Sequence, residues 1–330
     1  MTNADRYAHQ RYLLMTLDPV HPGAGGYRLG RVDNSIAREP GTRLPKIPGS
    51  SLHGAARSYA AYLYETPAAA GQSHQKVENP ETNPVLYTFG QIIDDEMYSG
   101  VVNIFDAHLL LFPVHSVVGP VWVSTQERLQ EAGFTVENVP QSWDEDKILT
   151  TLPDCQRLNL GWLMLDVVET GPKIAITPPD EWKEAPQWEA VAKSLVLVPD
   201  SLFSHIVNSN LEVRTSVAIN PETGAAEDKA LFTYEAIPRA AFLTAEVVLD
   251  DYVPDQERPR PFPKSTTGKA NPLPGGEWKG PLDVVRAGLG MIEYLSVGGM
   301  GTRGFGRIKL IGNAVEKAQE DIFASLEERP

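Results

Sequence analysis

Two segments near the start of the chain carry side chains that could act on a phosphodiester. His21 opens a glycine-rich stretch (HPGAGG), and Asp33 follows in VDNSIARE, with Arg31 and Arg38 close by. An aspartate among arginines stays ionised, so it can accept a proton or bind a divalent metal ion. Simpler roles are also open: Asp33 could form a salt bridge to Arg31 or Arg38, and His21 could be a loop residue without chemistry.

Residues 298–307 (GGMGTRGFGR) form a second candidate for phosphate binding. Glycines at this density let the backbone approach a ligand and turn its N–H groups toward an anion, while Arg303 and Arg307 add positive charge. Phe305 could stack on a base or pack inside the protein. A dinucleotide-binding motif follows a strand and opens a helix, whereas this segment is expected after a helix and before a strand. No GK[ST] closes it as in a Walker loop. The alternative is a glycine-rich turn with ordinary surface arginines.

A third segment, KIPGSSL, predicts the start of a helix at Ser50 and Ser51. Proline and glycine punctuate the chain there, a serine caps, and apolar residues recur at helical spacing to about residue 65. The free N–H groups of a helix start lie at the positive end of its dipole and are a natural seat for a phosphate.

Composition restricts the class of protein. The 330 residues are 42% hydrophobic and 22% charged, as in a globular protein of one large domain or two smaller ones. No apolar run approaches the roughly 18 residues needed to cross a bilayer, and the N-terminus lacks the pattern of a signal peptide. The cytoplasm is therefore the expected location. The single Cys155 excludes an intrachain disulfide and Cys-rich zinc sites.

The formal net charge of −14 argues against a nucleic-acid-binding protein, because phosphate-binding surfaces carry a basic excess. The charge is unevenly distributed, however. Cations outnumber acids in residues 21–57, 258–279 and 294–315, whereas residues 143–146 and 316–328 are acidic. Each basic run could be a solvated face, but a basic stripe on an acidic protein remains compatible with RNA binding.

The predicted elements follow the order strand, loop, helix, several strands, helix, glycine loop and strand. Strands are expected at residues 11–17, 101–114, 121–124, 195–198, 211–219, 230–237, 241–249 and 307–311. Helices are expected at 50–65, 126–132, 185–192, 199–206 and 282–296, and a turn at 220–224. This order predicts an α+β fold with a β-α-β-β-α-β core and insertions, which is a ferredoxin-like or RRM-like architecture.

Five motifs together resemble the RAMP superfamily of CRISPR proteins, and within it the Cmr-type (type III-B) backbone subunits. They are VDNSIAREP and PGSSLHGAARS in the first quarter, NIFDAHLLLFPVHS in the middle, LFTYEAIP in the expected hairpin, and GGMGTRGFGRIKL near the end. PGSSL and the glycine-rich segment alone would indicate only the superfamily. FDAHLLLFPV and LFTYEAIP are more specific, and the motifs extend over residues 21–311.

The resemblance implies a single RAMP domain over residues 1–330, shaped like a right hand. An RRM-like palm would comprise about residues 7–65, 100–200 and 282–312. A β-hairpin thumb would comprise about 208–250, with flexible inserts at about 66–84 and 255–280. Such subunits form a filament of copies of themselves along a guide crRNA, together with other Cmr-type subunits. Each thumb then separates guide from target RNA at regular intervals. No membrane is implied.

The resemblance also assigns chemical roles. Asp33 matches the aspartate that cuts target RNA with a divalent metal ion (Mg or Mn), in a reaction in which a 2′-hydroxyl attacks the adjacent phosphate. Asp33 would orient that hydroxyl, accept its proton or bind the metal. His21 matches a supporting loop histidine. Tyr234 and Glu235 match thumb residues that lie near a neighbouring subunit's aspartate in the filament, so the active site would be shared between subunits.

RNA binding is expected from residues of the first loop, the helix start and the glycine-rich segment. They are Arg38, Lys46, Ser50, Ser51, Arg57, Gly299, Gly301, Arg303, Gly304, Phe305, Gly306 and Arg307. His53 stands where relatives often carry a basic residue, so Lys46 and Arg57 would carry more of the guide contact.

Three other functions remain open. The chain could be a structural RNA-binding subunit without chemistry, which the substitution Asp33→Ala would reveal. It could process CRISPR repeats alone and without metal, although the long hairpin and LFTYEAIP disfavour this. A small-molecule enzyme with a phosphate loop is the least supported, because no conventional nucleotide motif is present.

Overall fold

The computed structural model describes residues 7–25, 32–71, 76–93, 96–169, 171–251, 262 and 277–317. Within these residues the largest sheet contains β1 (Tyr7–Thr16), β2 (Lys46–Ile47), β5 (Val102–Ile104), β6 (Ala107–Ser116), β7 (Gly119–Ser124), β9 (Lys147–Thr150), β10 (Arg157–Leu160), β11 (Leu163–Val167), β13 (Leu195–Leu197), β16 (Phe242–Asp250) and β17 (Ile308–Lys317). The strand order is β10-β11-β9-β13-β7-β6-β16-β1-β17. The fold is mixed α/β with parallel and antiparallel pairs.

The middle of the sheet is antiparallel. β1 lies between β16 and β17, and β16 pairs on its other edge with β5 and β6. Tyr12 and Leu14 of β1 face one hydrophobic core, whereas Leu13 between them faces another. Successive residues of a strand point to opposite faces, so a strand that is apolar throughout must be covered on both.

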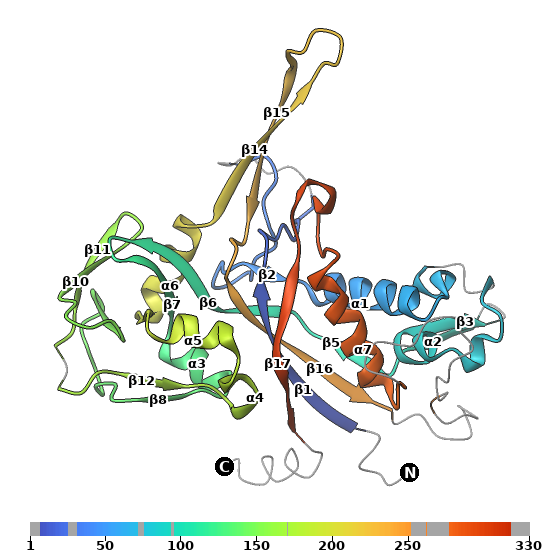
Figure 1. Ribbon diagram of the computed structural model, residues 1–330, viewed down its shortest axis with the longest axis horizontal. Helices are drawn as coiled ribbons and strands as arrows, with labels where there is room; N and C mark the ends of the chain where they lie inside the picture. The colour runs from blue at the N-terminus through green and yellow to red at the C-terminus, as the bar shows by residue number, and fades with distance from the viewer. Residues whose placement is uncertain are drawn as a thin grey trace.

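Helices α1 (Gly49–Leu63) and α7 (Pro281–Gly290) cover one face of this region (Figure 1). They pack closely because Gly288 has no side chain: a Cβ there would lie 2.1 Å from the carbonyl oxygen of Ala56. The short helix α2 (Pro84–Phe89) joins them, with the side chain of Asn83 accepting hydrogen bonds from the N–H groups of Val85 and Leu86. A small hairpin of β3 (Gly90–Ile93) and β4 (Glu96–Ser99) follows α2.

Helix α6 (Asp200–Ser209) buries Phe203, Ile206 and Val207 in the same core as α1 and α7. The other face is covered by a second lobe, which contains α3 (Gln126–Glu131), α4 (Asp180–Lys183), α5 (Pro186–Ala192) and the two-stranded sheet of β8 (Thr135–Glu137) and β12 (Ala175–Thr177). Phe134, Trp182 and Trp188 form an aromatic cluster at its centre. Glycine again permits a close approach, because a Cβ on Gly312 of β17 would lie 2.1 Å from the carbonyl oxygen of Glu181 in α4.

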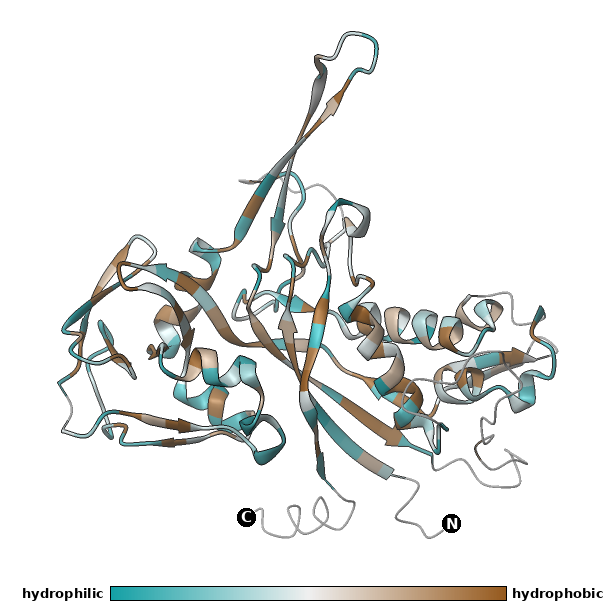
Figure 2. Ribbon diagram, viewed as in Figure 1, coloured by the Kyte–Doolittle hydropathy of each residue, from teal (hydrophilic) through white to brown (hydrophobic). Residues whose placement is uncertain are grey.

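A two-stranded arm of β14 (Glu212–Ile219) and β15 (Ala226–Ala236) projects from the body of the protein (Figure 1). Its predicted turn is confirmed: Asn220 accepts a hydrogen bond from the Gly224 N–H at 2.9 Å, and Gly224 has φ +66°. The arm exposes large apolar side chains, and Figure 2 shows hydrophobic stretches along it. The exposed residues include Val213, Val217, Ile219, Leu231 and Phe232.

The sequence prediction placed residues 241–249 in this arm, which is wrong. β16 lies in the large sheet between β1 and the β5–β6 edge, so the arm ends at β15. The expected strand at 101–114 is also wrong in part. It breaks at Phe105 and Asp106 into β5 and β6, because Asp106 turns aside to bind the start of α1.

The final helix is shorter than expected, because α7 ends at Gly290 and only a 3₁₀ turn (Met291–Glu293) continues it. Within its described residues, the insert at 66–84 includes the 3₁₀ helices Pro67–Ala70 and Pro80–Thr82 and buries Ala69 and Val77. Most of the insert at 255–280 lies outside the described residues. Two described residues there are packed: Phe262 against Tyr87 and Trp278 against Tyr64.

No helix in the described ranges is both long enough and apolar enough to span a bilayer.

Candidate functional site

The two glycine-rich segments and the base of the arm meet at one place. Val20 and Ile237 exchange two backbone hydrogen bonds of 2.9 Å, which joins the first loop to the end of β15. The Gly299 N–H donates to the His21 carbonyl at 2.9 Å, and the Gly306 N–H donates to the Pro19 carbonyl at 2.9 Å. The first loop and residues 298–307 therefore lie side by side at the base of the arm.

Asp33 lies exposed beside the arm, and Thr233 of β15 holds its carboxylate. The backbone N–H and the hydroxyl of Thr233 each donate to Asp33 Oδ2 at 2.8 Å. The Asp33 N–H donates in return to Thr233 Oγ1 at 2.9 Å. The hydrogen bond from the Thr233 backbone, followed by that from its hydroxyl, lowers the pKa of Asp33, so the carboxylate is ionised at neutral pH.

The segment around Asp33 is attached to the arm by its backbone as well. The Asn34 N–H donates to the Thr233 carbonyl, and the Glu235 N–H donates to the Asn34 carbonyl, both at 3.0 Å. These bonds form a parallel bridge between Asn34 and Tyr234. Asp33 therefore lies directly before a residue that is bridged to the base of the arm.

Arg38 and Glu235 form an ion pair beneath this segment. Arg38 Nη2 lies 2.6 Å from Glu235 Oε1, and the two side chains are only 14% and 12% exposed. Arg38 also donates through Nε to Asn208 Oδ1 at 3.1 Å and through Nη1 to the Ile36 carbonyl at 3.2 Å. Arg38, expected to bind RNA, thus directs its guanidinium at protein acceptors and fixes the loop that carries Asp33.

His21 and Tyr234 lie inside the site rather than on its surface, with exposures of 7% and 8%. His21 Nδ1 is 2.7 Å from the Glu235 carbonyl, so this nitrogen carries the proton and donates. The His21 ring meets the Tyr234 ring edge to face, with 6.0 Å between centroids. These two residues and Glu235 therefore support the loop from within, and a direct catalytic role for the three stays a prediction.

Residues 298–307 fold as the glycines require. Gly298 has φ +82°, and a Cβ on it would lie 2.7 Å from the His21 carbonyl oxygen. Gly306 has φ +95°, and a Cβ on it would lie 2.5 Å from the Val297 carbonyl oxygen. Arg303 is exposed, and its Nη1 donates to the Tyr234 hydroxyl at 2.9 Å. The loop thereby connects an exposed cation to the base of the arm, and its predicted contact with phosphate stays a prediction.

Phe305 is buried, with 4% of its surface exposed, and the guanidinium of Arg214 lies over its ring at 4.8 Å from the centroid. Of the two roles considered for Phe305, stacking on a base or packing inside the protein, the structure therefore supports packing. Arg307 is exposed and donates through Nε to Asp18 Oδ2 at 2.5 Å. This bond raises the pKa of Arg307.

At the start of α1 a carboxylate of the protein occupies part of the predicted phosphate seat. Asp106 Oδ1 accepts a hydrogen bond from the Gly49 N–H at 2.7 Å, and Asp106 Oδ2 pairs with Lys46. Partial burial of Asp106 raises its pKa, but the hydrogen bonds from Lys46 and Gly49 outweigh this and lower it. Ser50 remains exposed and Ser51 is half-buried. Asp106 thus supplies the negative charge that the helix start attracts.

Arg57 has a structural role that the sequence did not predict. Its Nε donates to the Ala69 carbonyl at 2.9 Å, and its Nη2 donates to the Gly90 carbonyl at 3.1 Å. Burial lowers the pKa of Arg57. The side chain joins α1 to the 66–71 segment and to β3, and the structure offers no support for its expected contact with guide RNA.

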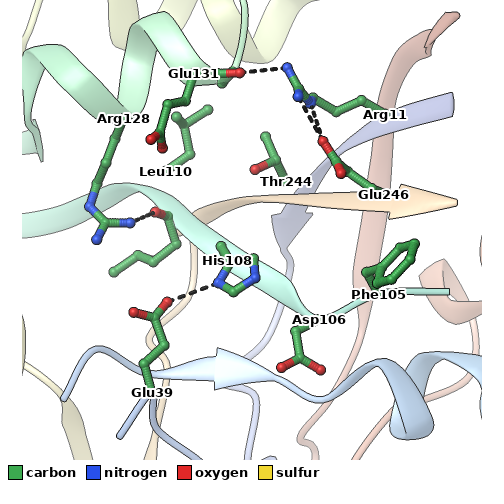
Figure 3. Close-up of a pocket in the computed structure, with 12 residues that line it drawn as sticks. Arg11, Glu39, Phe105, Asp106, His108, Leu110, Arg128, Glu131, Thr244 and Glu246 are labelled. Carbon is green, nitrogen blue, oxygen red and sulfur yellow. Dashed lines mark hydrogen bonds and ion pairs between the residues drawn. The ribbon is translucent and has the colours of Figure 1, made fainter. Parts of the chain in front are cut away.

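A cavity of about 640 Å³ lies on a different part of the sheet, between β6, β16 and α3 (Figure 3). Several of its charged residues pair with one another or with backbone groups. Arg11 binds Glu246 at 2.7 Å and the Glu131 carbonyl at 2.6 Å, and His108 lies 2.8 Å from Glu39. Hydrogen bonds from His9 and Arg11 lower the pKa of Glu246 to about 2. The cavity is therefore lined in large part by ion pairs.

Several residues of the site were not found from the sequence. They are Thr233, which binds Asp33; Asp18, which pairs with Arg307; Asp106, which caps α1; and Arg214, which covers Phe305. Asp106 and Thr233 lie inside the motifs FDAHLLLFPV and LFTYEAIP, which is the one signal that could have drawn attention to them.

The RAMP superfamily matches residues 13–309. The CRISPR system Cmr endoribonuclease Cmr4 of Pyrococcus furiosus is 26% identical over 311 residues, which cover 90% of this chain and 93% of that protein. The CRISPR system Cms endoribonuclease Csm3 of Enterococcus italicus is 34% identical over 94 residues, or 28% of this chain and 41% of that protein.

Solved structures show the same fold. The crystal structure of oligomeric Cmr4 from Pyrococcus furiosus has a TM-score of 0.54 at 19% identity, and the match covers 93% of this chain and 98% of that one. The Type III-B Cmr-beta structure bound to cognate target RNA contains a chain with a TM-score of 0.57 at 14% identity, covering 93% of this chain and 96% of that one.

Proposed function

Because the chain belongs to the RAMP superfamily, we propose that it is a backbone subunit of a Cmr-type (type III-B) CRISPR effector complex that cleaves target RNA. Asp33 carries the proposal. It is an exposed carboxylate, kept ionised by Thr233, at the junction of the arm and the first loop. The similarity to a Cmr endoribonuclease along 90% of the chain supports it.

In this proposal the central strands form a ferredoxin-like palm and the arm is the thumb. The order β17-β1-β16-β6 with antiparallel neighbours supports the palm, since a β-α-β-β-α-β unit with α1 and α7 as its helices places its strands in this order. The projection of β14 and β15 from the body supports the thumb.

The partners are guide crRNA, target RNA, further copies of the chain and other Cmr-type subunits. Arg303, Arg307 and Ser50 are the predicted RNA-binding side chains that remain exposed. Arg303 and Arg307 lie within or next to the glycine backbone of residues 298–306, whereas Ser50 lies at the start of α1. Binding to RNA should weaken as salt rises, because phosphate contacts release counterions. Such a complex would act in the cytoplasm, where its RNA targets are found.

The proposed cleavage is an in-line displacement at a ribose phosphate. The 2′-oxygen forms a bond to phosphorus as the bond to the 5′-oxygen breaks, leaving a 2′,3′-cyclic phosphate and a 5′-hydroxyl. The 2′-hydroxyl loses its proton, and the departing 5′-oxygen gains one. Asp33 would accept the first proton, orient the hydroxyl or bind a metal ion. His21, Tyr234 and Glu235 would hold the loop, each through the contacts described above.

A divalent ion (Mg or Mn) fits this site only if it shares its ligands with RNA. Among the described residues no cluster of three or more His, Cys, Asp and Glu side chains could hold a metal. Mg²⁺ is commonly bound through one or two carboxylates, with substrate phosphates and water completing its shell. Asp33 would then be its protein ligand, and the bound ion would neutralise charge that develops on the phosphate.

The assembled complex with Asp33→Ala tests the proposal. We expect target RNA to be bound but no longer cut at regular intervals, while Asp146→Ala, an exposed aspartate of the other lobe, cuts like the wild type. A target with a 2′-deoxyribose at the cleaved position should also resist. Regular cutting by the Asp33→Ala complex would instead make the chain a structural subunit. Metal-free cleavage of repeat RNA by the isolated chain would make it a guide-processing RNase.

A further inference from the structure

The contact between Asp33 and Thr233 is unusually complete for an exposed carboxylate. Three hydrogen bonds join residues that are 200 positions apart, two into Oδ2 and one from the Asp33 N–H into the threonine hydroxyl. Among the described residues Asp33 Oδ1 accepts no hydrogen bond, so one oxygen is bound to the arm and the other is available to RNA.

We propose that Thr233 is a positioning residue for Asp33, which fixes the carboxylate relative to the arm and to the RNA that the arm contacts. This inference rests on the proposed function and deepens it. The Asn34 and Tyr234 backbones are bridged beside the same contact. The arm and Asp33 therefore move together, so the position at which the arm binds RNA also determines which phosphodiester bond lies next to Asp33.

The physical reason is the freedom of an exposed side chain. An aspartate in solvent exchanges among staggered rotamers, and a catalytic group contributes to rate only from the geometry in which it can react. Thr233 removes that freedom before RNA binds. Arg38 and Glu235 fix the backbone of the same loop, but neither contacts the Asp33 carboxylate.

Thr233→Val distinguishes the contribution of the Thr233 hydroxyl from that of its backbone N–H. Valine has nearly the same shape and suits a strand, so β15 and the Thr233 backbone N–H to Oδ2 are kept, while both bonds of the hydroxyl are lost. Thr233→Ser restores a hydroxyl in the same place. Thr233→Ala removes it without adding a methyl group and should behave like valine.

Thr215 supplies a matched control. It lies directly opposite Thr233 in the register of β14 and β15, is exposed, and does not bond to Asp33. Thr215→Val therefore makes the same chemical change on the same part of the arm and leaves the Asp33 contact intact.

The test uses the assembled complex, with target affinity and single-turnover cleavage at saturating target measured separately. We expect Thr233→Val to lower the cleavage rate about tenfold, which corresponds to about 1.4 kcal/mol, with target affinity unchanged. Thr233→Ser should recover most of the rate, and Thr215→Val should match the wild type.

A wild-type cleavage rate for both Thr233→Val and Thr233→Ala overturns the inference, and so does an equal loss in Thr215→Val or a loss that appears only in target affinity. The Asp33→Ala complex in the same assay distinguishes this failure from that of the proposed function. If Asp33→Ala abolishes cleavage and the Thr233 variants are normal, only the positioning role falls. If Asp33→Ala cuts normally, both ideas fall.

Discussion

Glu235→Gln should destabilise the isolated chain by about 2 kcal/mol, because it removes the charge that opposes Arg38. The carboxylate lies 2.6 Å from Arg38 Nη2, and both side chains are less than 15% exposed. Removing one partner of a fully buried pair costs about 3–5 kcal/mol, whereas exposed pairs are worth about 0–1 kcal/mol. Glutamine keeps an oxygen in place and Arg38 keeps its bonds to Asn208 and Ile36. The expected value therefore lies between these limits.

Urea unfolding followed by tryptophan fluorescence measures this cost, and a double-mutant cycle with Arg38→Met isolates the pair. The double variant should be more stable than the sum of the two single effects by about 1 kcal/mol or more, since it leaves no unpaired buried charge. Asp166→Asn is the control. It makes the same acid-to-amide change in an ion pair with Arg157 whose side chains are 67% and 55% exposed, and it should cost almost nothing.

Additive effects in the cycle would refute the reasoning, as would a Glu235→Gln cost no larger than that of the control. Either result would mean that the loop carrying Asp33 is held by its backbone bonds to the arm and not by the ion pair. Amide hydrogen exchange at residues 34–38 should rise in Glu235→Gln, which localises the loosening to this loop.

Three further predictions concern stability away from Asp33. Glu246→Gln should lower the free energy of unfolding by about 1 kcal/mol at neutral pH, a value reduced because the ion pair is partly exposed. The folded pKa of Glu246 is lowered from 4.5 to about 2, so this loss of stability should be seen above about pH 4.5 and should vanish as the pH falls toward 2. Unfolding measured as a function of pH checks this. Gly306→Ala should lower the melting temperature more than Gly304→Ala, because both have positive φ but only the first places a Cβ 2.5 Å from the Val297 carbonyl oxygen. Asp106→Ala should cost about 1 kcal/mol in urea unfolding, as loss of a helix cap does, and a cost near zero would show that the start of α1 needs no carboxylate.

Local chemistry made much of the fold predictable. The start of α1 follows from proline and glycine before an apolar helical repeat, although the predicted serine cap is wrong: the helix begins at Gly49, and Pro48 at the N-cap position offers no side-chain hydrogen bond. The arm's turn follows from Asn220 and Gly224. The backbone path of residues 298–306 follows from glycines that adopt positive φ. These features depend on neighbours in the chain or on motifs that mark them.

Arrangements between distant segments were less accessible. β16 was assigned to the arm because its alternation of apolar residues is that of any strand, and pairing partners are set by the whole sheet. The break at Phe105 and Asp106 interrupts an apolar run because a carboxylate binds a helix start 57 residues earlier. No local pattern contains that bond.

The sequence by itself determined which residues could bind phosphate or act on a phosphodiester: an aspartate near arginines, glycines that free backbone N–H groups, and cations concentrated in a few runs. Only the tertiary structure decided which of them are free to act. Arg38, Lys46 and Arg57 are bound to the protein's own acceptors, Phe305 is buried, and Arg303 remains exposed. The reason is that a side chain's charge is a property of its type, whereas its partners and its access to solvent depend on what the fold brings beside it.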